Sequence, residues 1–184
     1  TFLQDQRIPA GIWNKKGMME ELNQILKTKF NTDKSLVKTI MNNQVFFNTD
    51  IIEELGLDYA AIKQVVVDRL KKDKDVHYAF DMEKTSTESI PAELKFRAIN
   101  GYNRERSGGV QIILKPAHYE YGNSRGTTHG AWNPYDIHIP CLFMGWGIRH
   151  GESAQPHYMT DIAATVCALL HIQAPNGCIG TPIF

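Results

Sequence analysis

The chain has 184 residues with 20 basic and 20 acidic side chains, so its formal net charge is zero, and this balance argues against nucleic-acid binding through a basic face. Its length suits one medium domain, or part of a core with a smaller lobe, and is enough to bury a hydrophobic core. No apolar run reaches the roughly 20 residues of a membrane-spanning helix, and no signal peptide opens the sequence. Because Thr1 does not resemble a natural start, we expect an upstream part of the same protein.

The first elements predicted after an irregular start are a helix and a hairpin. Apolar residues recur at helical spacing over residues 18–30, which predicts a helix opened by Gly17. Residues 36–41 and 45–47 have the composition of two strands, and the Asn-Asn pair at 42–43 predicts the tight turn between them.

Helix and strand patterns continue to alternate after the hairpin. Asp58 has the position of an N-cap for a helix over 59–70. Apolar and polar residues alternate over 76–81, which predicts a half-buried strand. A Ser-x-Pro start predicts a helix over about 91–99, and residues 110–114 form an apolar strand closed by a proline.

The second part of the chain opens with a long loop. Residues 116–134 are rich in Tyr, Gly, Asn, Ser, Thr and His, and loops of this length in compact domains are commonly either functional or disordered. The apolar run 139–144 predicts a buried strand. Thr160 is the predicted cap of a helix through Leu170, with Asp161 placed to interact favourably with the helix dipole.

The three cysteines do not form a recognisable zinc pattern, and their odd number prevents complete pairing. Cys141 lies in the predicted strand and Cys167 on the apolar helix, so both are expected to be buried free thiols. Cys178 lies in a glycine-containing tail.

His129 is the first candidate for a functional residue. It lies in Gly126-Thr-Thr-His-Gly, and a neutral imidazole flanked by glycine can approach a divalent metal closely. Zinc normally takes about three or four protein ligands, however, and no HxxxH or HxH pattern connects another histidine to this one. His138 alternates with apolar neighbours, which favours a hydrogen-bonded structural role. A phosphate-binding loop and a G-x-S-x-G nucleophile elbow are both absent from the sequence.

Several motifs together resemble the C-terminal part of the alkaline phosphatase superfamily. They are Gly126-Thr-Thr-His-Gly, Tyr135-Asp136-x-His138-x-Pro140, Phe143-x-Gly145-x-Gly147-Ile148, Met159-Thr-Asp-Ile-Ala and the tail Ala174-Pro-Asn-Gly-Cys-Ile-Gly-Thr-Pro-Ile. The sequence is most similar to the bacterial, mostly periplasmic, phosphate-irrepressible type, which is related to nucleotide pyrophosphatase/phosphodiesterases. Upstream, Ile8-Pro-Ala-Gly, Asn100-Gly-Tyr and Ser107-Gly-Gly resemble the lobe inserted in that fold.

The resemblance implies a division of the chain. The fold would be part of a three-layer α/β/α core with an inserted small α/β lobe. Residues 1–16 would be a linker from the missing upstream core, residues 17–115 the inserted lobe, and residues 116–184 the C-terminal part of the catalytic core.

The resemblance also implies a chemistry. In that family two divalent metal ions, usually zinc, activate a Thr or Ser that attacks phosphorus and forms a covalent phospho-enzyme. His129 matches the C-terminal metal ligand, with Thr128, Asp136 and His138 as residues that would support it. The nucleophile has no match in this chain, so no catalytic residue is assigned. We therefore expect a small phosphate mono- or diester as substrate, a periplasmic or secreted location, and neither hydrolysis nor tight zinc binding by the chain alone.

Two alternatives remain open. A sulfatase or phosphoglycerate-mutase-like relative shares the tail pattern. A non-catalytic interaction module would use the lobe to bind a protein or glycan. The sequence immediately before Thr1 discriminates among them, because it would contain the nucleophile and the paired Asp-His ligands.

Overall fold

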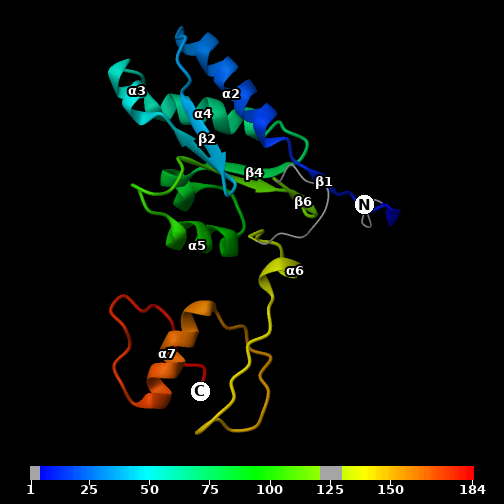
Figure 1. The fold of residues 1–184 in the computed structure, drawn as a ribbon, viewed down its shortest axis with the longest axis vertical. Coiled ribbons are helices and arrows are strands. Elements are labelled where there is room, and N and C mark those ends of the chain that lie inside the picture. Colours follow the sequence, from blue (N-terminus) through cyan, green and yellow to red (C-terminus); the bar gives the residue numbers. More distant parts are fainter. Residues whose placement is uncertain (1–4, 121–129) are drawn as a thin grey trace. The chain divides into compact units, whose positions relative to one another are not determined.

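The computed structural model describes residues 5–120 and 130–184 (Figure 1). The chain forms two compact units, Thr1–Ile139 and Pro140–Phe184. The predicted inserted lobe at 17–115 lies within the first unit, and its assignment as an insertion stays a prediction.

The first unit contains all the helices and strands predicted between residues 17 and 114, together with several short elements that the sequence did not indicate. In chain order they are β1 (Gly11–Ile12), α2 (Lys15–Phe30), β2 (Val37–Met41), β3 (Gln44–Phe47), α3 (Thr49–Glu54), α4 (Tyr59–Leu70), β4 (Val76–Asp81), the 3₁₀ helix η1 (Met82–Thr87), α5 (Ala92–Gly101), β5 (Val110–Leu114), β6 (His118–Tyr119) and α6 (Pro134–Ile137).

Caps and a turn residue explain where the early elements begin. The side chain of Asn14 accepts a hydrogen bond from the Gly17 N–H at the start of α2. Asp58 caps α4 by accepting from two backbone N–H groups, which confirms its predicted role. Asn42 and Asn43 have φ angles of 51° and 58°, the left-handed pair that joins β2 to β3 in a two-residue hairpin.

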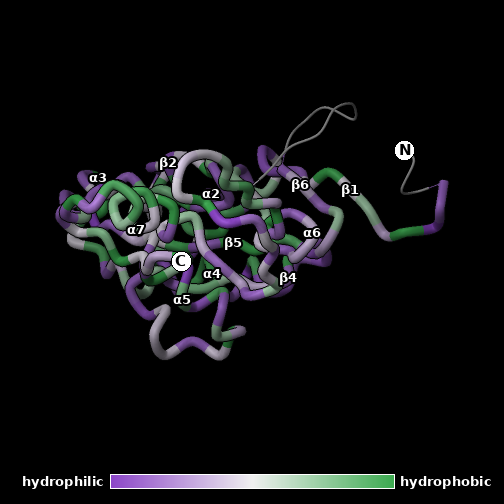
Figure 2. Tube along the Cα trace, turned by 90° about the horizontal axis from the view of Figure 1, so that it is seen from below, coloured by the Kyte–Doolittle hydropathy of each residue, from purple (hydrophilic) through white to green (hydrophobic). Residues whose placement is uncertain are grey.

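The main sheet has four strands in the order β2-β3-β5-β4, and each neighbouring pair is antiparallel. Val45 of β3 pairs with Val110 of β5, while Ala79 of β4 pairs with Ile112 on the other side of β5. Figure 2 shows β5 as a mainly hydrophobic segment. A second, two-stranded sheet joins β1 and β6 in parallel.

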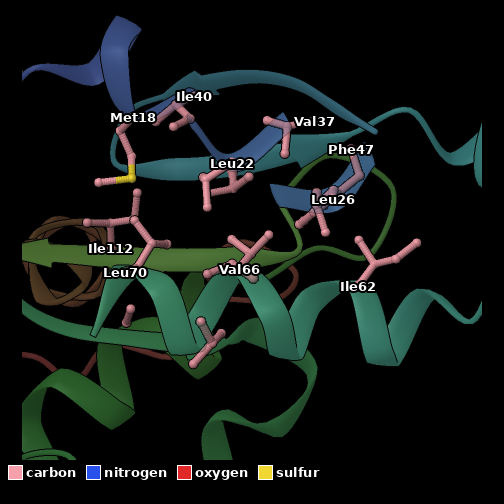
Figure 3. Packing of buried hydrophobic residues seen from close by; sticks show 14 of the residues in the cluster. Met18, Leu22, Leu26, Val37, Ile40, Phe47, Ile62, Val66, Leu70 and Ile112 are labelled. Carbon is pink, nitrogen blue, oxygen red and sulfur yellow. The ribbon is translucent and has the colours of Figure 1, made fainter. Parts of the chain in front are cut away.

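Helices cover both faces of the four-stranded sheet. Helices α2 and α4 pack on one face, where the side chains of Leu22, Val66 and Ile112 point into a shared interior (Figure 3). On the other face, α5 and η1 contribute Leu94 and Met82 to a smaller cluster. The two helical layers on either side of the sheet are visible in Figure 1.

Strand β4 is half-buried only in its first part: His77 is exposed as predicted, but Ala79, Phe80 and Asp81 are all buried, so the predicted alternation fails at its end. The pairing with β5 shifts between Val76 and Tyr78, which places His77 in a bulge. As a result Val76 and Ala79 lie in the larger core, whereas Phe80 lies in the smaller one. The end of the strand, from Ala79 to Asp81, has no solvated side because it lies between the two clusters.

The second unit is built around α7 (Met159–Leu170), to which the C-terminal tail is hydrogen-bonded through the N–H groups of Thr181 and Ile183. The carboxylate of Asp161 accepts from the N–H of Tyr158 at 2.9 Å and of Thr181 at 3.0 Å. These bonds hold the pKa of Asp161 below its usual range. The N-cap is Tyr158 rather than the predicted Thr160, because the Asp161 carboxylate closes the capping box on the Tyr158 N–H.

The predicted buried strand at 139–144 is absent from the structure, and Figure 1 draws this yellow segment without an arrow. Leu142 and Met144 are 91% and 98% exposed. Within residues 140–184 no strand is available to pair with it, and an unpaired strand leaves its backbone groups to water. Cys141 is exposed for the same reason, and Cys167 is only partly buried, so neither is the fully buried thiol expected.

None of the helices in the described part of the chain is long and apolar enough to cross a membrane.

Candidate functional site

The predicted ligand His129 and its neighbour Thr128 lie outside the described residues. The structure describes the chain on both sides of this block, through Glu120 and again from Gly130. The described part of the candidate site therefore consists of the two segments that flank this block. We call them the stems: one ends at Glu120 and the other begins at Gly130.

The stem before the block is attached to the lobe. The Trp13 N–H donates to the carbonyl oxygen of Tyr119 at 2.8 Å, next to the pairing of β1 with β6. The carboxylate of Glu120 accepts from the N–H of Asn42 at 3.1 Å and of Asn43 at 3.2 Å. The last described residues before the block are thus held by both sheets of the first unit.

The stem after the block folds into the short helix α6. The Ala131 N–H donates to Oδ2 of Asp136 at 3.0 Å, so this predicted supporting residue fixes backbone two positions after His129. The Tyr135 hydroxyl accepts from the Ala117 N–H at 2.8 Å, which joins the two stems. The other predicted supporting residue, His138, is exposed at the end of α6.

Two other histidines each lie near one carboxylate. His118 Nε2 lies 3.5 Å from Oδ1 of Asp75, and His157 Nδ1 lies 4.0 Å from Oδ2 of Asp161. Residues 5–120 and 130–184 contain no group of three His, Cys, Asp or Glu side chains able to hold a metal ion. Zinc takes about three or four protein ligands, so the described residues do not by themselves fit a metal centre.

A buried lysine is the feature that the sequence interpretation missed. The Lys63 side chain is 2% exposed, and its Nζ lies 2.9 Å from Oδ1 of Asp81 and 2.5 Å from Oε2 of Glu83. It also lies 4.8 Å from the centre of the Tyr59 ring, a cation–π distance. Residue 63 follows Tyr59 by four positions and precedes Val66 by three, so a lysine on the apolar stripe of α4 was the available signal.

The charged side chains of this cluster stabilise one another in their ionised forms. Burial opposes the charge on Lys63, but hydrogen bonds to Glu83 and Asp81 outweigh it and raise the lysine pKa. The same hydrogen bond from Lys63 lowers the pKa of Glu83. Burial raises the pKa of the Tyr59 hydroxyl. This cluster is a network of paired charges within the lobe, and it includes none of the predicted ligand residues.

Comparison with known proteins decides the family. No family model matches the chain. Alkaline phosphatase PafA from Elizabethkingia meningoseptica is 44% identical over 182 residues, which are 99% of this chain and 33% of the relative. The crystal structure of PafA covers 99% of this chain with a TM-score of 0.92, and this chain covers 34% of it. Alkaline phosphatase PhoV from Synechococcus elongatus is 53% identical over 145 residues, 79% of this chain and 26% of the relative.

The chain belongs to the alkaline phosphatase superfamily. The predicted family and its α/β fold class are thereby confirmed, and the chain resembles the C-terminal part of these alkaline phosphatases. It spans about a third of the length of the relatives it matches. A further relative, from Myroides odoratus, is 40% identical over 183 residues, 99% of this chain and 33% of that protein, and is named a calcium-transporting ATPase. The names of these relatives thus describe two different activities.

Proposed function

We propose that the complete protein containing this chain is a metal-dependent hydrolase of small phosphate mono- or diesters that forms a covalent phospho-threonine or phospho-serine intermediate. The observation that carries the proposal is the likeness to alkaline phosphatase PafA over 99% of the chain, in sequence and in fold. Because the chain spans about a third of that relative, the nucleophile and most metal ligands are assigned to the remaining part.

The proposed contribution of this chain is one ligand and its support. His129 provides an imidazole to one of two divalent ions, most simply zinc, and Asp136 steadies the backbone that follows it. One ligand does not make a metal shell, and the described residues contain no group of three suitable donors. The isolated chain should therefore be inactive and should hold zinc only weakly.

The test compares the complete open reading frame with the isolated chain. Both are assayed with p-nitrophenyl phosphate, its bis ester and p-nitrophenyl sulfate, before and after chelation and zinc readdition. The complete protein should hydrolyse a phosphate ester, lose activity with chelator and regain it with zinc. The isolated chain should show no turnover. Tight stoichiometric zinc binding by the isolated chain would contradict the single-ligand assignment.

The alternatives give different results in the same assay. Preference for the sulfate ester indicates the sulfatase-like alternative. No turnover of any ester, together with an upstream sequence that lacks a Thr or Ser nucleophile and an Asp-His pair, indicates an interaction module. ATP hydrolysis that depends on calcium would point instead to the activity in the name of the Myroides odoratus relative.

His129→Ala in the complete protein tests the ligand directly. Loss of a ligand should weaken zinc binding by more than the roughly 10- to 100-fold that loss of an outer partner costs. His150→Ala is the matched control, because His150 is exposed and is not assigned to the site. Fractionation of cells that express the complete protein tests the proposed periplasmic or secreted location.

A further inference from the structure

The carboxylate of Glu120 makes an unusual long-range contact with a hairpin turn. Its Oε1 and Oε2 accept hydrogen bonds from the backbone N–H groups of Asn42 and Asn43, which lie 78 and 77 positions away in the sequence. The side chain of Glu120 is 10% exposed, and the Lys15 ammonium lies 3.8 Å from Oε1. Charge-assisted bonds of this kind are stronger than bonds between neutral groups.

The hairpin turn does not require this carboxylate. Two left-handed residues form such a turn by themselves, and exposed N–H groups can bond to water instead. The β2–β3 pairing continues through Ile40 with Val45 regardless of Glu120. The contact therefore fixes the position of Glu120 more than it stabilises the hairpin turn.

Glu120 is the last described residue before the block that contains His129. Residues on the two sides of this block are joined by the bond from the Ala117 N–H to the Tyr135 hydroxyl, 18 positions apart. Asp136 in turn holds the Ala131 backbone. The contact to the hairpin turn thus attaches a closed pair of stems to the four-stranded sheet of the lobe.

We propose that Glu120 is a positioning residue, which fixes the lobe's hairpin turn to the stem of the His129 block. The inference rests on the proposed function, because it assigns to the lobe the role of positioning the His129 block for that reaction. Displacement by about 1 Å of a group that acts in the reaction can cost on the order of 100-fold in rate. We therefore expect Glu120→Ala in the complete protein to lower kcat roughly 10- to 100-fold and to change KM by less than about threefold.

The experiment has two arms. In the isolated chain, hydrogen exchange of the Asn42 and Asn43 amides reports the contact, and Glu120→Ala should accelerate both roughly tenfold or more. In the complete protein, kcat and KM for p-nitrophenyl phosphate are measured beside the melting temperature. Glu120→Gln retains one acceptor oxygen, so it should recover part of both effects. Glu21→Ala is the control, since it removes an exposed carboxylate that binds Arg69 at 2.6 Å and 2.7 Å on the same unit.

Each outcome decides the proposal. A fall in kcat with Glu120→Ala, partial rescue by Gln and no fall with Glu21→Ala support it. An active wild-type protein whose kcat is unchanged by Glu120→Ala overturns the inference alone. Equal losses in the Glu120 and Glu21 variants, in proportion to melting temperature, also overturn it, because they report stability only. An inactive wild-type protein overturns the proposed function and the inference together.

Discussion

Lys63 donates a hydrogen bond of 2.9 Å from Nζ to Oδ1 of Asp81, and this bond connects helix α4 to the end of strand β4 inside the lobe. The same Asp81 oxygen accepts from the Glu83 N–H at 3.0 Å at the start of η1. Both Lys63 and Asp81 are buried. One carboxylate oxygen thus links a helix, a strand and the helical turn that follows it.

Replacement of Lys63 by methionine should destabilise the chain by about 3–5 kcal/mol, because it leaves the Asp81 carboxylate buried without its cation. Urea unfolding followed by circular dichroism measures the change. Lys71→Met is the control: its side chain is 50% exposed and lies 3.9 Å from Glu88, so its loss should cost less than about 1 kcal/mol. Equal losses of unfolding free energy in the two variants would show that the buried Lys63–Asp81 pair contributes no more to stability than the exposed Lys71–Glu88 pair.

The Lys63–Glu83 pair should contribute stability within a defined pH window. The folded pKa of Glu83 lies below 4.5, so its contribution is present above pH 4.5 and is lost as pH falls through the folded pKa. The folded pKa of Lys63 lies above 10.5, so its contribution is present below pH 10.5 and is lost as pH rises through the folded pKa.

The measurement for this window is the difference in unfolding free energy between the wild type and Glu83→Gln. We expect a constant difference between pH 4.5 and 10.5 that shrinks below the lower limit and above the upper one. A difference that grows as the solution becomes acidic would contradict the lowered pKa of Glu83.

Gly109→Ala should destabilise the lobe by about 1–3 kcal/mol through overpacking. A Cβ atom at this position would clash with the Tyr59 hydroxyl and would lie 3.1 Å from the Phe47 ring and 3.2 Å from Cδ of Lys63. Gly101→Ala is the matched control, because nothing lies within 4 Å of its Cβ position. Since Gly101 is the last residue of α5, that change should be neutral or stabilising by up to about 1 kcal/mol. Thermal unfolding of both variants in the same buffer tests the contrast.

Asn43→Gly should preserve or raise the stability of the hairpin, while Asn43→Ala should lower it. The φ of 58° costs a residue with a Cβ roughly 1–2 kcal/mol, which glycine avoids. The Asn43 side-chain oxygen is buried and has no hydrogen-bond partner among the described residues, so its removal carries no lost bond. Denaturant midpoints should rank glycine at or above asparagine, and asparagine above alanine. A lower midpoint for glycine than for alanine would contradict the argument.

Local pattern accounts for much of the lobe. The apolar spacing of α2, the cap at Asp58 and the Asn-Asn turn each depend on residues within a few positions of one another. Such features could be predicted because short-range geometry alone dictates them. The identity of His129 as a candidate ligand also came from one short motif, and it stays a prediction.

The segment 139–144 shows the limit of local pattern. Its apolar composition is typical of a strand, yet Leu142 is 91% exposed because a strand forms only where a partner supplies hydrogen bonds. The burial of Ala79 and Phe80 on opposite faces at the end of β4 was equally beyond prediction, since it depends on α4 and α5, which lie on opposite faces of the sheet.

The sequence by itself determined the family, the helices and strands of the lobe, and the residue to examine as a ligand. Tertiary structure decided that β5 lies between β3 and β4, that Lys63 is paired inside the lobe, and that Glu120 is hydrogen-bonded to the turn at Asn42. Those contacts join residues 18 to 78 positions apart. Local periodicity does not predict such pairs, because they are stabilised by burial and hydrogen bonding between segments that are distant in the sequence.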